Sequence, residues 1–186
     1  MRSRRILTLC FAVAFLFAAS PIVPPADASS LPPASGDWVI EPAEDITISD
    51  QDLLLPGSLY VNGRLVLNGC TIRVAPTGCG DRGVEVNGTL EATDTTFVSV
   101  TAVPDAEWLV LARFAVNAGS NAFTGCRFEH FFACFLGASQ NAFDSCEFVG
   151  GWSPWINFKD DSRNDLVNCT LCHRPKFNFN DRCHRF

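Results

Sequence analysis

Several features that would assign a function are scarce or missing in this sequence. Its only methionine is Met1, so no internal methionine could serve as an axial ligand of a haem iron. Residues 29–63 carry no lysine or arginine. The sequence also contains no Ser/His/Asp spacing, no glycine-rich phosphate loop and no nucleotide-binding fingerprint. The familiar motifs of hydrolases and nucleotide-dependent enzymes therefore give no guide to function.

A segment that repeats itself is the strongest positive signal. The pattern Asn-x-Φ-x-x-Cys-x-Φ, in which Φ is apolar, occurs at Asn121–Phe128, Asn141–Phe148 and Asn164–Leu171. A regular period of about 20 residues indicates a solenoid, in which each unit buries its apolar face against its neighbours. Stretches such as Cys-Arg-Phe alternate inward and outward side chains, which is the periodicity of a strand. The repeat predicts a parallel β-helix.

Fainter units precede this segment. Leu59–Leu65 and Val84–Leu90 match each other at a spacing of 25 residues, and each carries Asn-Gly between apolar-alternating stretches. Asn and Gly tolerate the left-handed backbone of tight corners. An antiparallel hairpin at each Asn-Gly is the local alternative. The regular spacing favours corners stacked along one axis.

The pattern resembles the right-handed parallel β-helix repeat family of secreted and surface proteins. The resemblance covers residues 36–183 and is most specific over residues 121–171. In that family, inward asparagines of successive coils stack into ladders. Three asparagines match one ladder position: Asn121, Asn141 and Asn164. The cysteine of each repeat stands where the family usually has a second asparagine, which is a departure. The resemblance implies an all-β, right-handed helix of about seven coils, and it implies no activity.

The first 28 residues have the pattern of a secretory signal peptide. A basic start, Met1–Arg5, precedes the apolar run Ile6–Ala19, and Ala26–Ala28 offers a small-x-small cleavage site. A membrane anchor needs about 20 apolar residues, and this run is shorter and is followed by prolines. We expect a signal peptide at 1–28, a disordered lead-in at 29–35 and one β-helix domain at 36–186. The mature protein would be secreted or held at the cell surface, with no transmembrane segment.

The cysteines beyond residue 28 are even in number, which in an exported chain predicts disulfide bonds. The candidates are Cys70, Cys79, Cys126, Cys134, Cys146, Cys169, Cys172 and Cys183. The three repeat cysteines should stack about 4.8 Å apart, within the usual range of Cα separations for a disulfide. Stacked free thiols in the core are the alternative. Three members of one column cannot all pair within it.

Two cofactor alternatives use the cysteines near the end of the chain. Cys169-Thr-Leu-Cys172-His173 spells C-x-x-C-H, the signature of covalent haem attachment. Cys169, Cys172 and Cys183, with His173 or His184, could instead hold a tetrahedral zinc ion. The repeat already accounts for Cys169, and Cys183 and His184 are adjacent, which hinders joint coordination. We therefore expect no cofactor, with haem and zinc as the alternatives.

Candidate catalytic and carbohydrate-contacting residues lie between residues 152 and 163. Asp160 and Asp161, with Arg163 nearby, could act as general acid and base or bind a cation. One charged loop without converging partners is more typical of a solvated turn, so we expect no catalytic residue there. Trp152 and Trp155 could stack on sugar rings or pack at the edge of the core.

Two asparagines match the glycosylation acceptor pattern, namely Asn87 in Asn-Gly-Thr and Asn168 in Asn-Cys-Thr. Asn87 is the better candidate, because Asn168 precedes a cysteine that is expected to point inward.

Charge is distributed unevenly along the chain. Residues 29–63 are acidic, whereas residues 173–186 are rich in arginine, lysine and histidine. In a β-helix these regions form opposite ends of a rod, so head-to-tail self-association is predicted. A formal net charge of −6 argues against nucleic acid as a partner. We expect an exported structural protein of the cell surface or extracellular matrix. Its partners would be further copies or other envelope components. A carbohydrate-binding or polysaccharide-cleaving module is the alternative.

Overall fold

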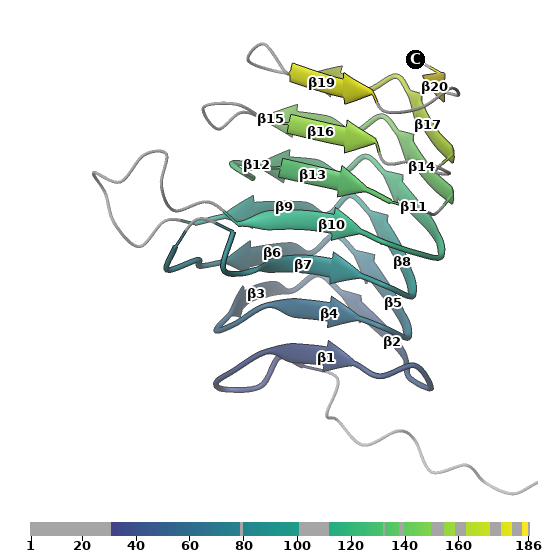
Figure 1. Ribbon diagram of the computed structural model, residues 1–186. Helices are drawn as coiled ribbons and strands as arrows, with labels where there is room; N and C mark the ends of the chain where they lie inside the picture. Colours follow the sequence, from purple (N-terminus) through teal and green to yellow (C-terminus); the bar gives the residue numbers. More distant parts are fainter. Residues whose placement is uncertain are drawn as a thin grey trace, which may run out of the picture.

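The chain is an all-β parallel solenoid in the computed structural model (Figure 1). The structure describes residues 31–78, 80–100, 112–131, 133–137, 140–149, 155–158, 163–171, 176–179 and 184–185. Its strands form three sheets that run the length of the solenoid, here named A, B and C. No helix in these ranges is long and apolar enough to cross a membrane.

Each coil contributes its strands in the order A, B, C. Sheet A contains β1 (Trp38–Ile40), β4 (Leu59–Val61), β7 (Gly83–Val86), β10 (Arg113–Val116), β13 (Ala133–Leu136), β16 (Trp155–Phe158) and β19 (Lys176–Phe179). Sheet B contains β2 (Asp45–Ser49), β5 (Arg64–Asn68), β8 (Thr89–Thr93), β11 (Ser120–Thr124), β14 (Gln140–Asp144), β17 (Arg163–Val167) and β20 (His184–Arg185). Sheet C contains β3 (Asp52–Leu55), β6 (Thr71–Val74), β9 (Thr96–Ser99), β12 (Arg127–Glu129), β15 (Glu147–Val149) and β18 (Thr170–Leu171).

Neighbouring strands within a sheet come from successive coils and run parallel, as the repeat predicted. The hairpin alternative at Asn-Gly is wrong, because β4 and β5, which flank Asn62-Gly63, belong to different sheets. The structure supports about four turns, from β1 to β12, within which residues 79 and 101–111 lie outside the described ranges, and further gaps follow in the later coils. The expected count of about seven coils is larger than this. The coil count and the right-handed sense therefore stay predictions.

The residue types that fill the core change along the axis of the solenoid. Aliphatic side chains such as Leu65 and Leu67 line the first coils, and phenylalanines line the coils from Phe97 onward. Equivalent phenylalanines of successive coils stack face to face, with ring centroids 4.7 Å apart for Phe123 and Phe143. Phe128 and Phe148 stack in the same way at 4.8 Å. These separations match the spacing of neighbouring strands, so each ring sits directly above its counterpart.

The asparagine ladder is confirmed. Asn121 pairs in register with Asn141, and Asn141 pairs with Asn164. All three are buried, with relative exposures of 3%, 3% and 0%. The amide of Asn121 donates to Oδ1 of Asn141 at 3.1 Å, and the amide of Asn141 donates to Oδ1 of Asn164 at 2.7 Å. The ladder satisfies polar groups that would be costly to bury alone.

The two kinds of corner use glycine for different reasons. Between sheets B and C, every coil places one residue in the left-handed region, with φ between 49° and 63°. These residues are Asp50, Gly69, Asp94, Gly125, Ser145 and Asn168. The glycines of the Asn-Gly corners between sheets A and B are not left-handed, so that expectation is wrong for Gly63 and Gly88. A Cβ on Gly88 would lie 2.1 Å from the carbonyl oxygen of Gly63, so close stacking of the coils requires glycine there.

Candidate functional site

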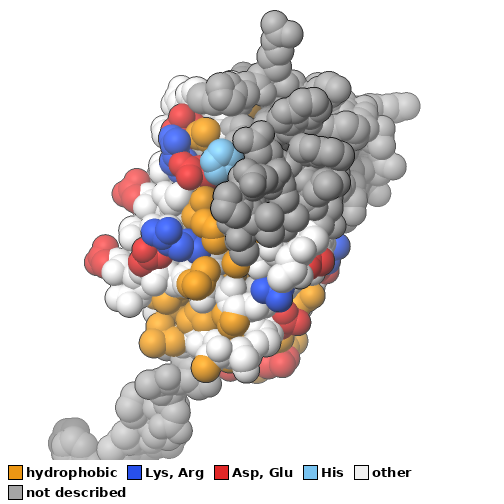
Figure 2. All heavy atoms as spheres, turned by 90° about the vertical axis from the view of Figure 1, so that its left-hand side faces the viewer, with side chains coloured by type: hydrophobic (Ala, Val, Ile, Leu, Met, Phe, Trp, Pro, Cys, Tyr) orange, Lys and Arg blue, Asp and Glu red, His pale blue; other side chains and the backbone are white. Residues whose placement is uncertain are grey.

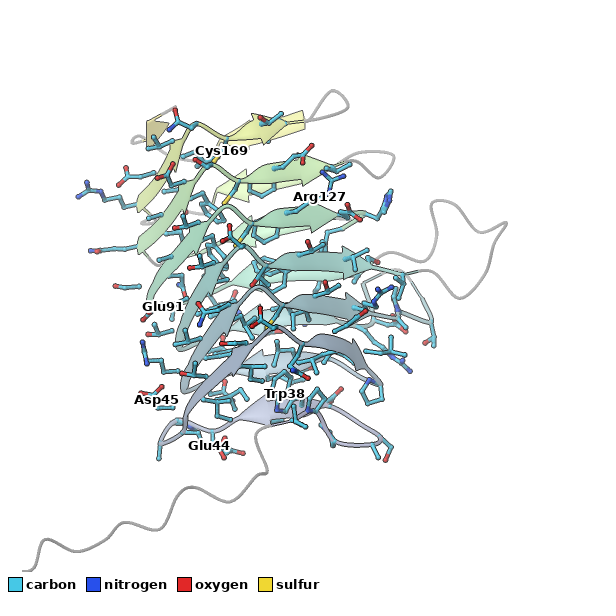
Figure 3. All side chains as sticks on the ribbon, turned by 180° about the vertical axis from the view of Figure 1, so that it is seen from behind. Trp38, Glu44, Asp45, Glu91, Arg127 and Cys169 are labelled. Carbon is cyan, nitrogen blue, oxygen red and sulfur yellow. The ribbon has the colours of Figure 1, made fainter. Side chains whose placement is uncertain are left out.

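The outer face of sheet B carries a hollow with a volume of about 480 Å³. It spans four successive strands, β8, β11, β14 and β17. Its lining residues are Glu91, Ser120, Asn121, Ala122, Gln140, Asn141, Ala142, Arg163 and Asp165. Figure 3 shows Glu91 on this flank, above Asp45 of the first coil.

Strand register arranges the lining in two columns along the solenoid axis. Glu91, Ala122, Ala142 and Asp165 are successive partners in one column. The neighbouring column holds the polar side chains Ser120, Gln140 and Arg163. Alternation along each strand turns these side chains outward, while Asn121 and Asn141 turn inward between them. Two short alanines therefore form a floor that is closed by a carboxylate at either end.

Both carboxylates that bound the hollow are already paired with arginine. Nε and Nη2 of Arg64 each lie 3.1 Å from an oxygen of Glu91, and Nη1 of Arg64 lies 2.8 Å from Asp45. Hydrogen bonds to Glu91 and then to Asp45 raise the pKa of Arg64. Nε of Arg163 lies 3.4 Å from Asp165. The hollow therefore presents paired charges, hydroxyl and amide groups, with no isolated charge at its ends.

The same pairing occurs on the other flanks. Arg73 donates two hydrogen bonds to Asp52, of 2.6 and 2.8 Å. Hydrogen bonding to Arg73 is the main cause that lowers the pKa of Asp52. Arg113 binds Glu85 at 2.6 Å. A further set links one arginine with two glutamates, namely Arg127 with Glu129 and Glu147. Figure 2 shows basic and acidic side chains side by side on one flank. Within the described part of the chain, most ion pairs join successive coils, whereas Arg127–Glu129 and Arg163–Asp165 each lie within one strand.

The predicted catalytic and carbohydrate-contacting residues are only partly within the described ranges. Arg163 lines the hollow on sheet B. Asp160, Asp161 and Trp152 lie outside the described residues. Trp155 begins β16, where its backbone pairs with Ala133, and its side chain is not described.

The predicted disulfides are not found among the cysteines that the structure describes. Cys70, Cys126, Cys146 and Cys169 carry free thiols. Each thiol donates to a carbonyl oxygen of the coil below, as in Cys126 to Ala92 at 3.3 Å and Cys146 to Phe123 at 3.3 Å. The stacking is therefore as predicted, but each sulfur is directed towards a backbone carbonyl. The remaining candidates lie outside the described side chains: Cys79, Cys134, Cys172 and Cys183.

The stacked thiols shift one another's acidity. Hydrogen bonding with Cys126 is the largest cause that raises the pKa of Cys146 to about 12. Hydrogen bonding with Cys146, and then burial, raises the pKa of Cys169 as well. The hydrogen bond from Cys146 lowers the pKa of Cys126. Cys146 and Cys169 are therefore held as neutral thiols at physiological pH, which makes them poor nucleophiles.

The described residues include no group of three or more histidine, cysteine or acidic side chains that could hold a metal ion. The haem and zinc alternatives also need Cys172, His173 and Cys183, which lie outside the described residues. Of the proposed ligands only Cys169 has a described side chain, and its thiol donates to Phe143 O at 3.6 Å.

The two glycosylation candidates occupy different corners. Asn87 is exposed and belongs to an outer amide ladder, in which its Nδ2 donates to Asn62 and its Oδ1 accepts from Asn117, both at 3.0 Å. Asn168 is exposed at a left-handed corner, with φ of 54°. Both side chains reach solvent, and attachment of a sugar at Asn87 would use the nitrogen that bonds to Asn62.

Sequence reasoning missed most of the hollow. Glu91, Ser120, Gln140 and Asp165 belong to no motif, and their outward positions follow only from the strand register. The signal was nevertheless available, because aligning the repeats places Ser120, Gln140 and Arg163 one residue before the ladder asparagines.

Comparison with known proteins assigns no family to the chain. No protein-family model, no curated protein and no solved structure matches it. Its likeness to parallel β-helix proteins rests on the repeat and on the parallel coils. The evidence on function is therefore the geometry of the solenoid itself.

Proposed function

We propose that this protein is an exported structural β-solenoid of the cell surface or extracellular matrix, wound as a right-handed helix of about seven coils. The ion pairs that join successive coils carry this proposal. Each described arginine on the flanks bonds to a carboxylate or, for Arg82, to the carbonyl oxygens of Pro56 and Ala75. Catalysis would instead need charged groups converging on a reacting atom.

The N-terminal sequence supports export. Residues 1–28 combine a basic start, an apolar run and a small-x-small site, as secretory signal peptides do. An outer surface of internally paired charges suits a scaffold, since it holds its coils together without a bound ligand.

Fractionation of the source cells tests this proposal. The protein should appear in the envelope or the medium, cleaved near residue 28, and a pull-down from intact envelopes should recover further copies or envelope components. Full-length protein confined to the cytosol would contradict the proposal.

Polysaccharide binding on the outer face of sheet B is the second candidate. The hollow on that face supports it, because hydroxyl, amide and guanidinium groups above an alanine floor suit sugar hydroxyl groups. Binding is favoured over cleavage. Glu91 and Asp165 are three coils apart, about 14 Å at about 4.8 Å per coil, whereas glycosidase carboxylates lie about 5–9.5 Å apart.

Titration with soluble polysaccharides tests the second candidate. Gln140→Ala should weaken binding about two- to tenfold if Gln140 contacts the sugar, since a hydrogen bond contributes about 0.5–1.5 kcal/mol. Asn117→Ala, which follows β10 and lies outside the lining of the hollow, is the matched control and should leave binding unchanged. Release of reducing sugar would indicate cleavage, and no detectable binding would exclude this candidate.

A further inference from the structure

The N-terminal end of the solenoid carries a second hollow, with a volume of about 290 Å³. Its lining combines apolar side chains with two acids: Leu31, Pro33, Asp37, Trp38, Val39, Glu44 and Ile46. Figure 3 shows Trp38 and Glu44 at the lowest coil, where the lead-in departs. This hollow is therefore on the end face of the rod, away from the hollow on sheet B.

Exposed apolar side chains gather at the same end. Leu31 is 54% exposed, Val39 is 39% exposed and Leu54 is 62% exposed. These residues belong to the lead-in, β1 and β3, which are the first elements of the chain. Figure 2 also shows hydrophobic side chains at the surface near the lower end. Among the described residues, Val167 of β17 is a further exposed large apolar side chain, so most but not all of this surface lies at the N-terminal end, where it marks a candidate docking site.

The strands at this end are also sheet edges. β1, β2 and β3 are each the terminal member of a sheet, with a partner strand on one side only. An edge strand presents unpaired N–H and C=O groups that can pair with another chain. The N-terminal end therefore offers backbone hydrogen bonds as well as apolar contact.

The charge of this end is negative. Six acids and no lysine or arginine occur in residues 29–63: Asp37, Glu41, Glu44, Asp45, Asp50 and Asp52. Arg64 and Arg73 of the next coil neutralise Asp45 and Asp52. Glu44 accepts a hydrogen bond from the backbone of Glu41 at 2.7 Å and forms no ion pair with the other described residues. A partner for this end should therefore be cationic and apolar.

The opposite end of the same chain has that composition. Residues 173–186 contain Arg174, Lys176, Arg182 and Arg185, three phenylalanines and a single acid, Asp181. The last strands of sheets A and B, β19 and β20, lie within this segment. Strand register also puts Phe177 and Phe179 in the same columns as Trp38 and Ile40. A second copy stacked in register would continue both apolar columns.

We infer that the N-terminal end of one molecule binds the C-terminal end of a second copy of this chain, β1 pairing beside β19. The inference deepens the structural function proposed above. The contact joins two different surfaces, so it does not close on itself and each added copy leaves one end free. The product is an open filament whose growth is limited only by concentration.

Sedimentation of the purified protein across a salt series tests the inference. Association should weaken at least about tenfold between 0.05 and 1 M salt, because the Debye length falls to about 3 Å. Reversing Arg174, Lys176, Arg182 and Arg185 to Glu should lower the association constant at least about tenfold at low salt. Asp144→Lys, on the flank of β14, changes charge without touching either end and should leave association unchanged.

A mixing experiment separates head-to-tail association from other modes. Val39→Asp blocks the N-terminal end, and the four-Glu variant blocks the C-terminal end. Each variant alone should stay monomeric, and an equimolar mixture should stop at a dimer. Val39 is outward and partly exposed, so its substitution should leave the far-UV circular dichroism unchanged. If either variant misfolds, competition by a peptide of residues 172–186, with its charge-reversed form as control, replaces it.

Several outcomes would overturn the inference. They are a wild type that stays monomeric at high concentration and low salt, a mixture that remains monomeric, or polymerisation of either blocked variant alone. A monomer that still fractionates with the envelope would refute this contact and leave the structural function intact. A cytosolic protein that forms filaments would support this contact and contradict the exported structural function.

Discussion

At the scale of single residues, stacking decides what a side chain does. Asn141 and Asn87 both belong to amide ladders with neighbours one coil away. Asn141 is buried, whereas Asn87 is exposed to water. The same hydrogen bond therefore has a different energetic weight at the two positions, since only the buried ladder lacks water as a substitute partner.

We expect Asn141→Ala to destabilise the protein by about 1–3 kcal/mol, because it removes a buried partner from both Asn121 and Asn164. Asn87→Ala is the matched control on the outer ladder and should cost less than about 1 kcal/mol. Urea unfolding of the two variants beside the wild type measures the difference. Equal costs would show that burial does not decide the weight of the ladder.

The thiol of Cys146 should make the folded protein less stable as the pH rises above 9.0. Its pKa is raised from 9.0 to about 12 in the folded state, so the folded protein keeps a proton that the unfolded chain loses. This contribution is fully present below pH 9.0 and is lost as the pH rises towards about 12. The unfolding equilibrium should shift by up to about tenfold per pH unit in that window.

Comparing the wild type with Cys146→Ala tests this effect for the thiol stack as a whole, because the variant also removes the hydrogen-bond partner that lowers the pKa of Cys126 and raises that of Cys169. The variant should lose less stability than the wild type between pH 9 and pH 11 in urea unfolding. Parallel pH profiles would mean that the stacked thiols do not hold the proton.

At the scale of elements, the corners between sheets B and C impose one backbone conformation on every coil. Each coil there has a left-handed residue, although the residue type varies from Gly69 and Gly125 to Ser145 and Asn168. A non-glycine residue in this conformation costs about 1–2 kcal/mol. The stacking of the coils therefore requires a left-handed residue at this corner, even where a non-glycine residue raises the conformational energy.

We expect Ser145→Gly to stabilise the protein by up to about 1 kcal/mol, because glycine adopts a φ of 56° without strain. The matched control is Ser120→Gly in β11, where glycine should destabilise by about 0.5–1 kcal/mol. Thermal unfolding of both variants decides. A destabilising Ser145→Gly would mean that the side chain, and its 3.0 Å hydrogen bond to Asp144, outweighs the backbone strain.

At the scale of the whole molecule, each coil is stabilised by the coils on both sides. The strands of the middle coils, such as β5 and β8, have a partner on either side, whereas β1, β2 and β3 have one. Cooperative stability should therefore be highest in the middle and lowest at the ends of the rod.

Hydrogen exchange should reveal this gradient. In 1 M salt, amides of β5 and β8 should exchange at least about tenfold more slowly than those of β1 to β3. At low salt and high concentration the difference should shrink if a second copy covers the N-terminal edge. Uniform protection along the rod in high salt would contradict the gradient.

The repeat was sufficient to predict the parallel coils and the inward column of Asn121, Asn141 and Asn164. Both follow from a period that returns equivalent residues to one column at each turn of the chain. The described cysteines form no disulfide, for a reason that the sequence period does not contain. Strand spacing brings the Cα atoms into range, but the direction of each Sγ depends on a carbonyl oxygen one coil away, such as Ala92 O below Cys126.

The outer face of sheet B shows the same division. The sequence by itself determined that Gln140 and Arg163 precede ladder asparagines and so point outward. The same alignment puts Ala122 and Ala142 in one column. Only the tertiary structure decided that Arg64 reaches both Asp45 and Glu91. Periodicity fixes the column of a side chain. The partners of Arg64 lie 19 and 27 residues away in the sequence, and only the packing of the coils brings their side chains together.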